Sequence, residues 1–316
     1  MPFIKPRLAS SASTPVHQLM RRADEVILGK QHAIQQAVAC LLARGHLLIE
    51  DLPGVGKTTL AHLLARLFGL QFQRIQFTSD LLPADIIGAT IYDRNAGSFH
   101  FHPGPVFAQL VLADEVNRAT PKTQSALLEA MEERQVTVEG DTRPLPEPFF
   151  VVATQNPGSQ IGTFPLPESQ LDRFLMRIQL GYPDRAAEHE LLRGVDRRDI
   201  LRDMQPMMAQ EDLLALQRQV DHVHVADAVV DYVQALMDYT RSSEQFHSGL
   251  SPRAGLALLR AARAWALLEG RDAVLPEDIQ QVFVSVSCHR LHAVGGTPGQ
   301  HEPRLATQVL DNVPVP

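Results

Sequence analysis

Residues 46–69, HLLIEDLPGVGKTTLAHLLARLFG, limit the possible folds of this chain more than any other segment. A short apolar run leads into a glycine-rich loop, and a helical spacing of apolar residues follows, which predicts a buried strand, a tight turn and a helix. Such a turn brings backbone N–H groups, a helix N-terminus and a lysine to one place, and a polyphosphate binds to that combination. The segment therefore predicts an α/β domain that binds a nucleotide.

The loop residues are expected to share the work of holding the phosphates. Gly54 and Gly56 let the backbone approach closely, while Lys57 would neutralise the β and γ phosphates. The hydroxyl of Thr58 would bind Mg²⁺. The common pattern starts with a glycine where this chain has Asp51, and an ordinary glycine turn before a surface helix is the alternative interpretation. The expected phosphate-binding residues are Pro53, Gly54, Val55, Gly56, Lys57, Thr58 and Thr59.

Two further apolar runs end in polar residues that suit ATP hydrolysis. Because parallel strands end at a common edge of the sheet, Asp114 and Glu115 at the end of QLVLADE should lie beside the phosphate loop. Asp114 would hold Mg²⁺, and Glu115 would polarise the attacking water as a general base. Asn156, after FFVVATQ, could orient that water or contact the γ phosphate. The alternatives are a solvated acidic strand end for the first two residues and a turn residue for Asn156.

The chain divides into two predicted domains and two end segments. Helical segments separate five apolar runs, and this alternation favours a parallel sheet with helices on its faces. Beyond about residue 182 every periodic segment is helical. We expect a flexible lead-in at 1–15, an α/β ATPase core at 16–182, a helical lid at 183–294 and a Gly/Pro-rich, loosely ordered tail at 295–316.

Composition narrows the functional class. The 316 residues are 45% hydrophobic and 21% charged with a net charge of −7, so broad electrostatic attraction to nucleic acid or to an anionic membrane is not expected. Cys40 and Cys288 form no metal-binding pattern and favour a reduced setting. The sequence has neither a signal-peptide core nor an apolar run of membrane-spanning length. From the sequence we expect a soluble, cytoplasmic protein.

The segments EDLPGVGKT, GPVFAQLVLADEVNRATPKTQSALLEAMEE, VVATQNP, LPESQLDRF and SPRA together resemble the MoxR family of AAA+ ATPases. The resemblance covers about residues 19–292, and residues 104–133 are its most specific part. It implies an AAA+ fold with a five-stranded parallel sheet in the order 5-1-4-3-2 and a small helical lid. The phosphate loop would be its Walker A motif, and Asp114 and Glu115 would belong to Walker B.

The resemblance also assigns roles to single residues. Asn156 would be the sensor 1 residue, Arg173 an arginine finger that reaches a neighbouring subunit, and Arg253 the sensor 2 residue of the lid. A guanidinium suits such roles because it is planar and always charged, although each arginine could instead cap a helix or form a local ion pair. Ile27 and Gly29 would lie against the adenine.

Two inserts are expected within the core, near residues 86–106 and 136–148. The alternation in VTVEGDTRPL favours a β-hairpin for the second, with a turn at Gly140 and Asp141. In the family such loops line the pore of a ring or face partners.

The family resemblance implies a hexameric ring that uses ATP and Mg²⁺ to remodel or assemble a protein client, or to insert its metal cofactor. Relatives often act on proteins with a von Willebrand factor A domain, and we expect such a client here. One alternative is an ATP-dependent motor on DNA, against which the acidic charge and the lack of a basic and aromatic stripe argue. The other is a nucleotide-gated binding module that hydrolyses ATP slowly. Nucleic acid is therefore not an expected partner.

Overall fold

A computed structural model describes residues 13–157, 162–194, 196–295 and 303–315, so residues 1–12 of the expected lead-in lie outside it. Its core is a five-stranded parallel sheet in the order β2-β5-β8-β1-β9. This order confirms the 5-1-4-3-2 order that the family resemblance implied. The strands are β1 (Leu47–Glu50), β2 (Phe72–Gln76), β5 (Leu110–Asp114), β8 (Phe150–Gln155) and β9 (Met176–Ile178).

Successive side chains along a strand point to opposite faces of the sheet, and the apolar ones form two separate cores, one on each face. Leu47 and Ile49 of β1 join the core formed with α2 and α3, whereas Leu48 joins the core formed with α5. Because helices cover both faces, β1 and β5 are buried throughout, while the edge strand β2 buries only Ile75. The covering helices are α2 (Gln31–Leu42), α3 (Lys57–Leu67) and α5 (Pro121–Glu133).

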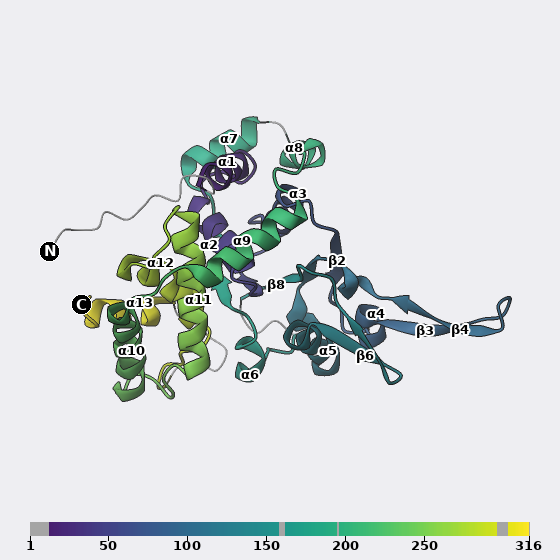
Figure 1. Cartoon of the computed structure of the whole chain (residues 1–316). Coiled ribbons are helices and arrows are strands. Elements are labelled where there is room, and N and C mark those ends of the chain that lie inside the picture. Colours follow the sequence, from purple (N-terminus) through teal and green to yellow (C-terminus); the bar gives the residue numbers. More distant parts are fainter. Residues whose placement is uncertain (1–12, 158–161, 195, 296–302, 316) are drawn as a thin grey trace.

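Helices dominate the chain after β9. Helices α10 to α13 gather on one side of the sheet (Figure 1), and α9 and α11 contact the core helix α2. None of the helices among the described residues has the length and apolar character needed to cross a bilayer. The helices outside the sheet layers are α1 (Ser13–Asp24), α7 (Arg185–Arg193), α8 (Arg197–Asp203), α9 (Gln210–His222), α10 (Asp227–Ser242), α11 (Pro252–Leu268), α12 (Pro276–Ser287) and α13 (Pro303–Asn312).

Helix α13 lies inside the segment that was expected to be a loosely ordered tail, and the structure differs from that expectation there. Ala306 and Val309 are fully buried, and α13 packs on α10 and α12. The glycine and proline content of the tail did not reveal this burial, because the two apolar residues find their partners only in the folded lid.

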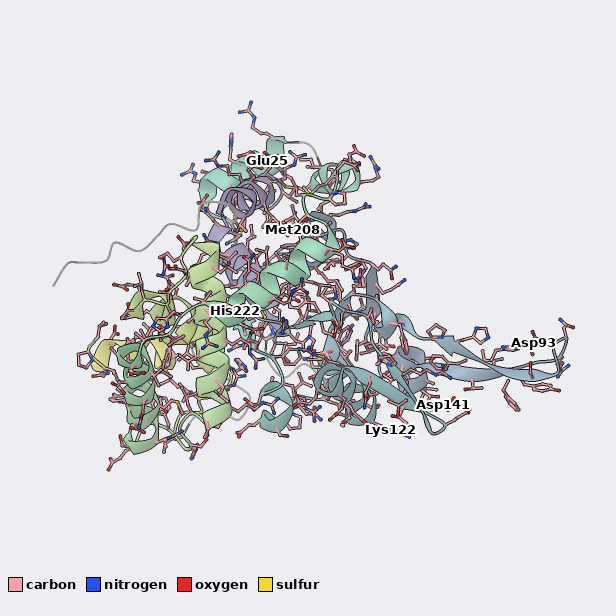
Figure 2. The ribbon with its side chains drawn as sticks, in the orientation of Figure 1. Glu25, Asp93, Lys122, Asp141, Met208 and His222 are labelled. Carbon is pink, nitrogen blue, oxygen red and sulfur yellow. The ribbon has the colours of Figure 1, made fainter. Side chains whose placement is uncertain are left out.

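Two antiparallel hairpins extend from the core on the side away from α10 to α13 (Figure 1). Asp93 lies near the far end of the longer hairpin and Asp141 lies at the turn of the shorter one (Figure 2). The shorter hairpin turns at Glu139 and Gly140, with φ of 53° and 90°, one residue earlier than predicted. Two positive φ values match the twist of the strands that they join. The hairpin strands are β3 (Gly88–Asp93), β4 (Ser98–Pro103), β6 (Gln135–Val138) and β7 (Asp141–Pro144), and the remaining short helices are α4 (Pro83–Ile87), α6 (Glu168–Leu171) and the 3₁₀ turns Pro105–Phe107 and Val116–Arg118.

Candidate functional site

The phosphate loop joins the end of β1 to the start of α3 and is open. Gly54 and Gly56 have φ of 84° and 99°, in the left-handed region that favours glycine. A Cβ built on either residue would meet no atom within 4 Å, so the loop borders free space. Helix α3 begins at Lys57, and the first N–H groups of a helix have no partner within it. These features fit the phosphates of a nucleotide.

Lys57 connects the loop with the neighbouring strand β8. Its ammonium group donates to the backbone oxygens of Asp51 and Leu52, the latter at 3.2 Å, and to Oδ1 of Asn156 at 2.9 Å. Burial lowers the pKa of Lys57, while the carboxylates of Asp51 and Asp114 act in the opposite direction. The ammonium group is thus held by oxygens of the protein itself, at the place where phosphate oxygens were expected.

Asp114, one of the two predicted Mg²⁺ ligands, ends β5. Its Oδ1 accepts a hydrogen bond from the Thr154 hydroxyl at 2.6 Å, and its Oδ2 forms an ion pair with Arg74 at 2.6 Å. The other predicted ligand, Thr58, is the second residue of α3. A carboxylate and a hydroxyl are oxygen donors of the kind that Mg²⁺ prefers, so these residue types fit the metal.

Glu115 adopts a φ of 57°, which is uncommon for a residue with a side chain. Its N–H donates to Oγ1 of Thr154 at 2.9 Å, and this bond supports the turn. Its carboxylate accepts hydrogen bonds from Asn156 at 3.2 Å, Gln76 at 3.1 Å and Arg118 at 2.8 Å. Backbone strain of this kind persists where the surroundings impose it, and it gathers at active sites.

Sequence reasoning missed four residues of this cluster: Arg74, Gln76, Arg118 and Thr154. Gln76 and Thr154 could have been found by the rule that selected Asp114, because they lie toward the carboxyl ends of neighbouring parallel strands, whereas Arg74 is the middle residue of β2. Gln76 pairs with Asp114 in the register of β2 and β5. Arg118 lies in the turn after β5 and carried no comparable signal.

The turn at residues 26–29 lies where core and lid meet. Ile27 is buried, and Gly29 has a φ of 69°. A Cβ on Gly29 would come within 3.2 Å of the Ala187 Cβ and 3.6 Å of an Asp184 carboxylate oxygen. Of the two residues that the resemblance assigned to the adenine, Gly29 therefore lies against the start of α7, the first helix after the sheet, and Ile27 is part of the buried core.

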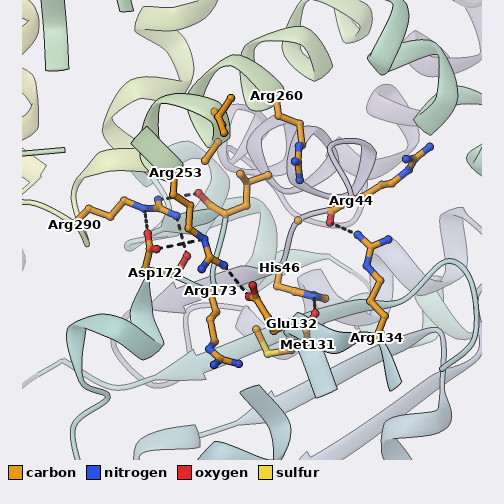
Figure 3. A pocket seen from close by; sticks show the side chains of 14 residues that line it. Arg44, His46, Met131, Glu132, Arg134, Asp172, Arg173, Arg253, Arg260 and Arg290 are labelled. Carbon is orange, nitrogen blue, oxygen red and sulfur yellow. Dashed lines mark hydrogen bonds and ion pairs between the residues drawn. The ribbon is translucent and has the colours of Figure 1, made fainter. Parts of the chain in front are cut away.

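A cavity of about 310 Å³ between the core and the lid has six arginines among its fourteen lining residues (Figure 3). Arg253 donates to Glu132 at 2.7 Å and pairs with Asp172 at 3.4 Å. Arg173 donates to the backbone oxygen of Leu128 at 2.6 Å. The charged residues of the wall are Arg44, Arg134, Arg173, Arg253, Arg260, Arg290, Glu132 and Asp172.

This arginine cavity and the phosphate loop lie at opposite ends of β1. Gly45 and His46, just before the strand, line the cavity, whereas the loop begins at Asp51, just after it. At about 3.3 Å per residue, five extended residues span roughly 16 Å. The structure thus groups Lys57, Asp114, Glu115 and Asn156, and it places Arg173 and Arg253 elsewhere.

Comparison with known proteins gives consistent matches. Residues 46–176 match the model of the ATPase family associated with various cellular activities (AAA), and residues 238–312 match the AAA lid domain. The chain is 44% identical over 307 residues to the uncharacterized protein YeaC of Bacillus subtilis, covering 95% of this chain and 96% of YeaC. It is 43% identical over 300 residues to the chaperone MoxR1 of Mycobacterium tuberculosis, covering 90% of this chain and 78% of MoxR1.

A solved structure also matches over nearly its full length. The crystal structure of a Cytophaga hutchinsonii protein, named as a candidate ATPase, has a TM-score of 0.88 and 36% sequence identity, and the match covers 98% of this chain and 97% of that one. The order of the strands, the helical lid and these relatives all indicate the same family. The chain belongs to the MoxR family of AAA+ ATPases.

Proposed function

We propose that this chain hydrolyses ATP with Mg²⁺ at the cluster beside the phosphate loop. The observation that carries the proposal is the connected set of hydrogen bonds from Lys57 through Asn156 to Glu115. One amide side chain thereby joins the cation that would hold the phosphates to the carboxylate that would activate water. Membership of an AAA+ ATPase family supports the same reaction class.

In this proposal residues 53–59 bind the phosphates, and Lys57 exchanges the backbone oxygens that it now contacts for phosphate oxygens. Glu115 accepts a proton from the attacking water, and Asn156 orients that water. Thr58 and Asp114 would hold Mg²⁺, which neutralises phosphate charge when bound. Ile27 and Gly29 would lie against the adenine.

The arginine cavity supports a shared site between copies of the chain. Arg173 and Arg253 line the cavity at the start of β1, whereas the phosphate loop follows the end of that strand, and six arginines and only two carboxylates surround the cavity. Such an excess of positive charge suits the γ phosphate of a nucleotide held by the next subunit. We therefore propose head-to-tail assembly into a ring, with six subunits as the family resemblance suggests.

We propose a protein client for this ring, remodelled, assembled or supplied with its metal cofactor, and carrying a von Willebrand factor A domain. The relative MoxR1 is named a chaperone, which supports a protein substrate. The β3–β4 hairpin offers a contact surface, because Ile91, Tyr92 and Phe99 are all more than half exposed. In functional terms we divide the chain into a core at 16–182 and a lid from 183 onward, and we place the protein in the cytoplasm.

The proposal is tested first with Lys57→Ala. Loss of the ammonium group should weaken ATP binding by roughly a hundredfold in calorimetry, because two charge-assisted contacts to phosphate disappear. Lys122→Ala, at an exposed lysine on α5 (Figure 2), is the matched control and should bind as the wild type does. Unchanged ATP binding in Lys57→Ala would refute the phosphate-loop assignment.

The proposal of a protein client is tested by measuring the ATPase rate of the wild type. The rate is measured once with a von Willebrand factor A domain protein and once with single-stranded DNA. We expect stimulation by the protein only. Stimulation by DNA alone would favour a DNA motor instead.

A further inference from the structure

Asp51 occupies the position where the common phosphate-loop pattern has glycine, and its carboxylate is fully engaged. Oδ1 accepts the N–H of Leu52 at 2.8 Å. Oδ2 accepts the N–H groups of Leu180 and Gly181, each at 2.6 Å. The residue is only 7% exposed, and charge-assisted bonds of this length are stronger than neutral ones. A single side chain therefore ties the first residue of the phosphate loop to a segment far along the chain.

That segment, residues 180–184, is called the lid linker here because it connects β9 to α7. At its far end Asp184 caps α7 by accepting the N–H of Ala187 at 2.8 Å. In its middle the backbone oxygen of Tyr182 accepts a hydrogen bond from the ammonium group of Lys30. The linker is therefore anchored beside the turn at residues 26–29 as well as beside the phosphate loop.

The two anchors coincide with the two ends of the proposed ATP site. Asp51 anchors the linker at the phosphate end, where its own backbone oxygen also holds Lys57. At the other end, which would hold the adenine and is called the base end, Gly29 packs against Ala187 and Asp184. The linker thus connects the two ends through defined contacts.

Building on the proposed ATPase function, we propose that Asp51 is a positioning residue that fixes the phosphate end of the ATP site relative to its base end through the lid linker. Its carboxylate bonds only to backbone N–H groups of Leu52, Leu180 and Gly181 among the described residues, so it acts through geometry rather than by contact with the reacting atoms. A ligand that needs both ends should depend strongly on Asp51, and a ligand that needs only the phosphate end should depend on it much less.

The test compares ATP with inorganic tripolyphosphate, both with Mg²⁺, in calorimetry. In Asp51→Ala we expect ATP to bind roughly tenfold more weakly or worse, because two strong linker bonds are lost. The affinity for tripolyphosphate should change much less, because at the phosphate end the variant loses only the bond to Leu52 and a carboxylate charge near Lys57. In steady-state assays KM should rise more than kcat falls, since the Glu115 cluster is untouched. Asp51→Asn should restore ATP affinity to within a few fold, because its amide oxygen can still accept from both linker N–H groups.

Asp212→Ala is the matched control, because Asp212 is an exposed lid carboxylate that also accepts a backbone N–H, that of Ala209 at 3.3 Å. It should leave ATP affinity unchanged. Wild-type ATP affinity in Asp51→Ala overturns the proposal, and so does an equal loss of ATP and tripolyphosphate affinity.

The wild type provides a measurement that needs no variant. In amide hydrogen exchange, ATP should slow exchange across residues 180–184, whereas tripolyphosphate should not. A linker whose exchange does not respond to bound ATP overturns the role of Asp51 and leaves the ATPase proposal standing. A wild-type protein that binds neither ligand overturns the ATPase proposal itself.

Discussion

Glu115 shows at the scale of one residue how the fold orients the side chain that we propose as the general base. Three donors from three different parts of the chain hold its carboxylate, and Thr154 supports its left-handed backbone. A side chain held in this way loses little freedom when a water molecule is placed beside it. Its orientation is thus set before ATP binds.

Glu115→Gln should keep ATP bound and stop its hydrolysis. The amide preserves the shape of the side chain but cannot accept the proton of the attacking water, so we expect turnover to fall by about two to four orders of magnitude. The measurement is phosphate release at saturating ATP, with ATP affinity checked separately. Glu129→Gln, at an exposed glutamate on α5, is the control, and wild-type turnover in Glu115→Gln would remove this residue from the mechanism.

Single side chains also hold whole elements together, and His46 is one example. It lies just before β1, where its Nδ1 accepts the N–H of Val151 in β8 at 3.0 Å and its Nε2 lies 3.2 Å from the backbone oxygen of Met131 in α5. These bonds require a neutral ring with its proton on Nε2. Burial lowers the pKa of His46 to about 4, and the bond to Met131 only partly opposes this shift.

The free energy of unfolding should therefore decrease in mild acid. The unfolded chain takes up a proton on this histidine near pH 6.5, whereas the folded chain does so only near pH 4, so protonation favours unfolding across that window. The loss attributable to His46 amounts to about 3 kcal/mol by pH 4 and is absent above pH 7. Urea unfolding at a series of pH values measures it.

His46→Gln should show a shallower decline between pH 6.5 and pH 4 than the wild type, even if its stability is lower at every pH. His189→Gln, at an exposed histidine on α7, is the control and should keep the wild-type slope. Equal slopes in the wild type and His46→Gln would show that other groups cause the acid sensitivity.

At the scale of the whole molecule, the phosphate loop and the arginine cavity lie at opposite ends of β1. The phosphate loop follows the end of β1 and the arginine cavity precedes its start, so in the proposed ring each subunit would present one half-site to each neighbour. Contacts of this kind are heterologous and can close into a ring. A nucleotide that bridges two subunits should favour the assembled form.

Arg173→Ala should bind ATP at its own phosphate loop and hydrolyse it far more slowly, because trans-acting arginines contribute on the order of a thousandfold or more in other phosphoryl-transfer enzymes. Mixing it with Lys57→Ala, which is inactive alone, should restore part of the activity at interfaces that pair an intact loop with an intact arginine. Full activity of Arg173→Ala alone would refute the shared site. So would a protein that stays monomeric with ATP at high concentration.

The sequence by itself determined the strand, loop and helix around Lys57, because short-range periodicity and glycine spacing encode them locally. It also placed Asp114, Glu115 and Asn156 at the ends of apolar runs, and parallel pairing then required these ends to share one edge of the sheet. The family resemblance supplied the strand order, which local patterns do not contain.

Only the tertiary structure showed which side chains meet. Asn156 touches both Lys57 and Glu115, and Asp51 reaches the lid linker, because residues far apart in sequence become neighbours when the strands pair. The fold also decides that Arg173 and the phosphate loop are apart, because Arg173 lies in the cavity at the start of β1 and the phosphate loop follows its end. Hydrogen bonds and charges act over a few ångströms in space, whereas sequence patterns extend over a few residues along the chain, and the fold alone relates the two.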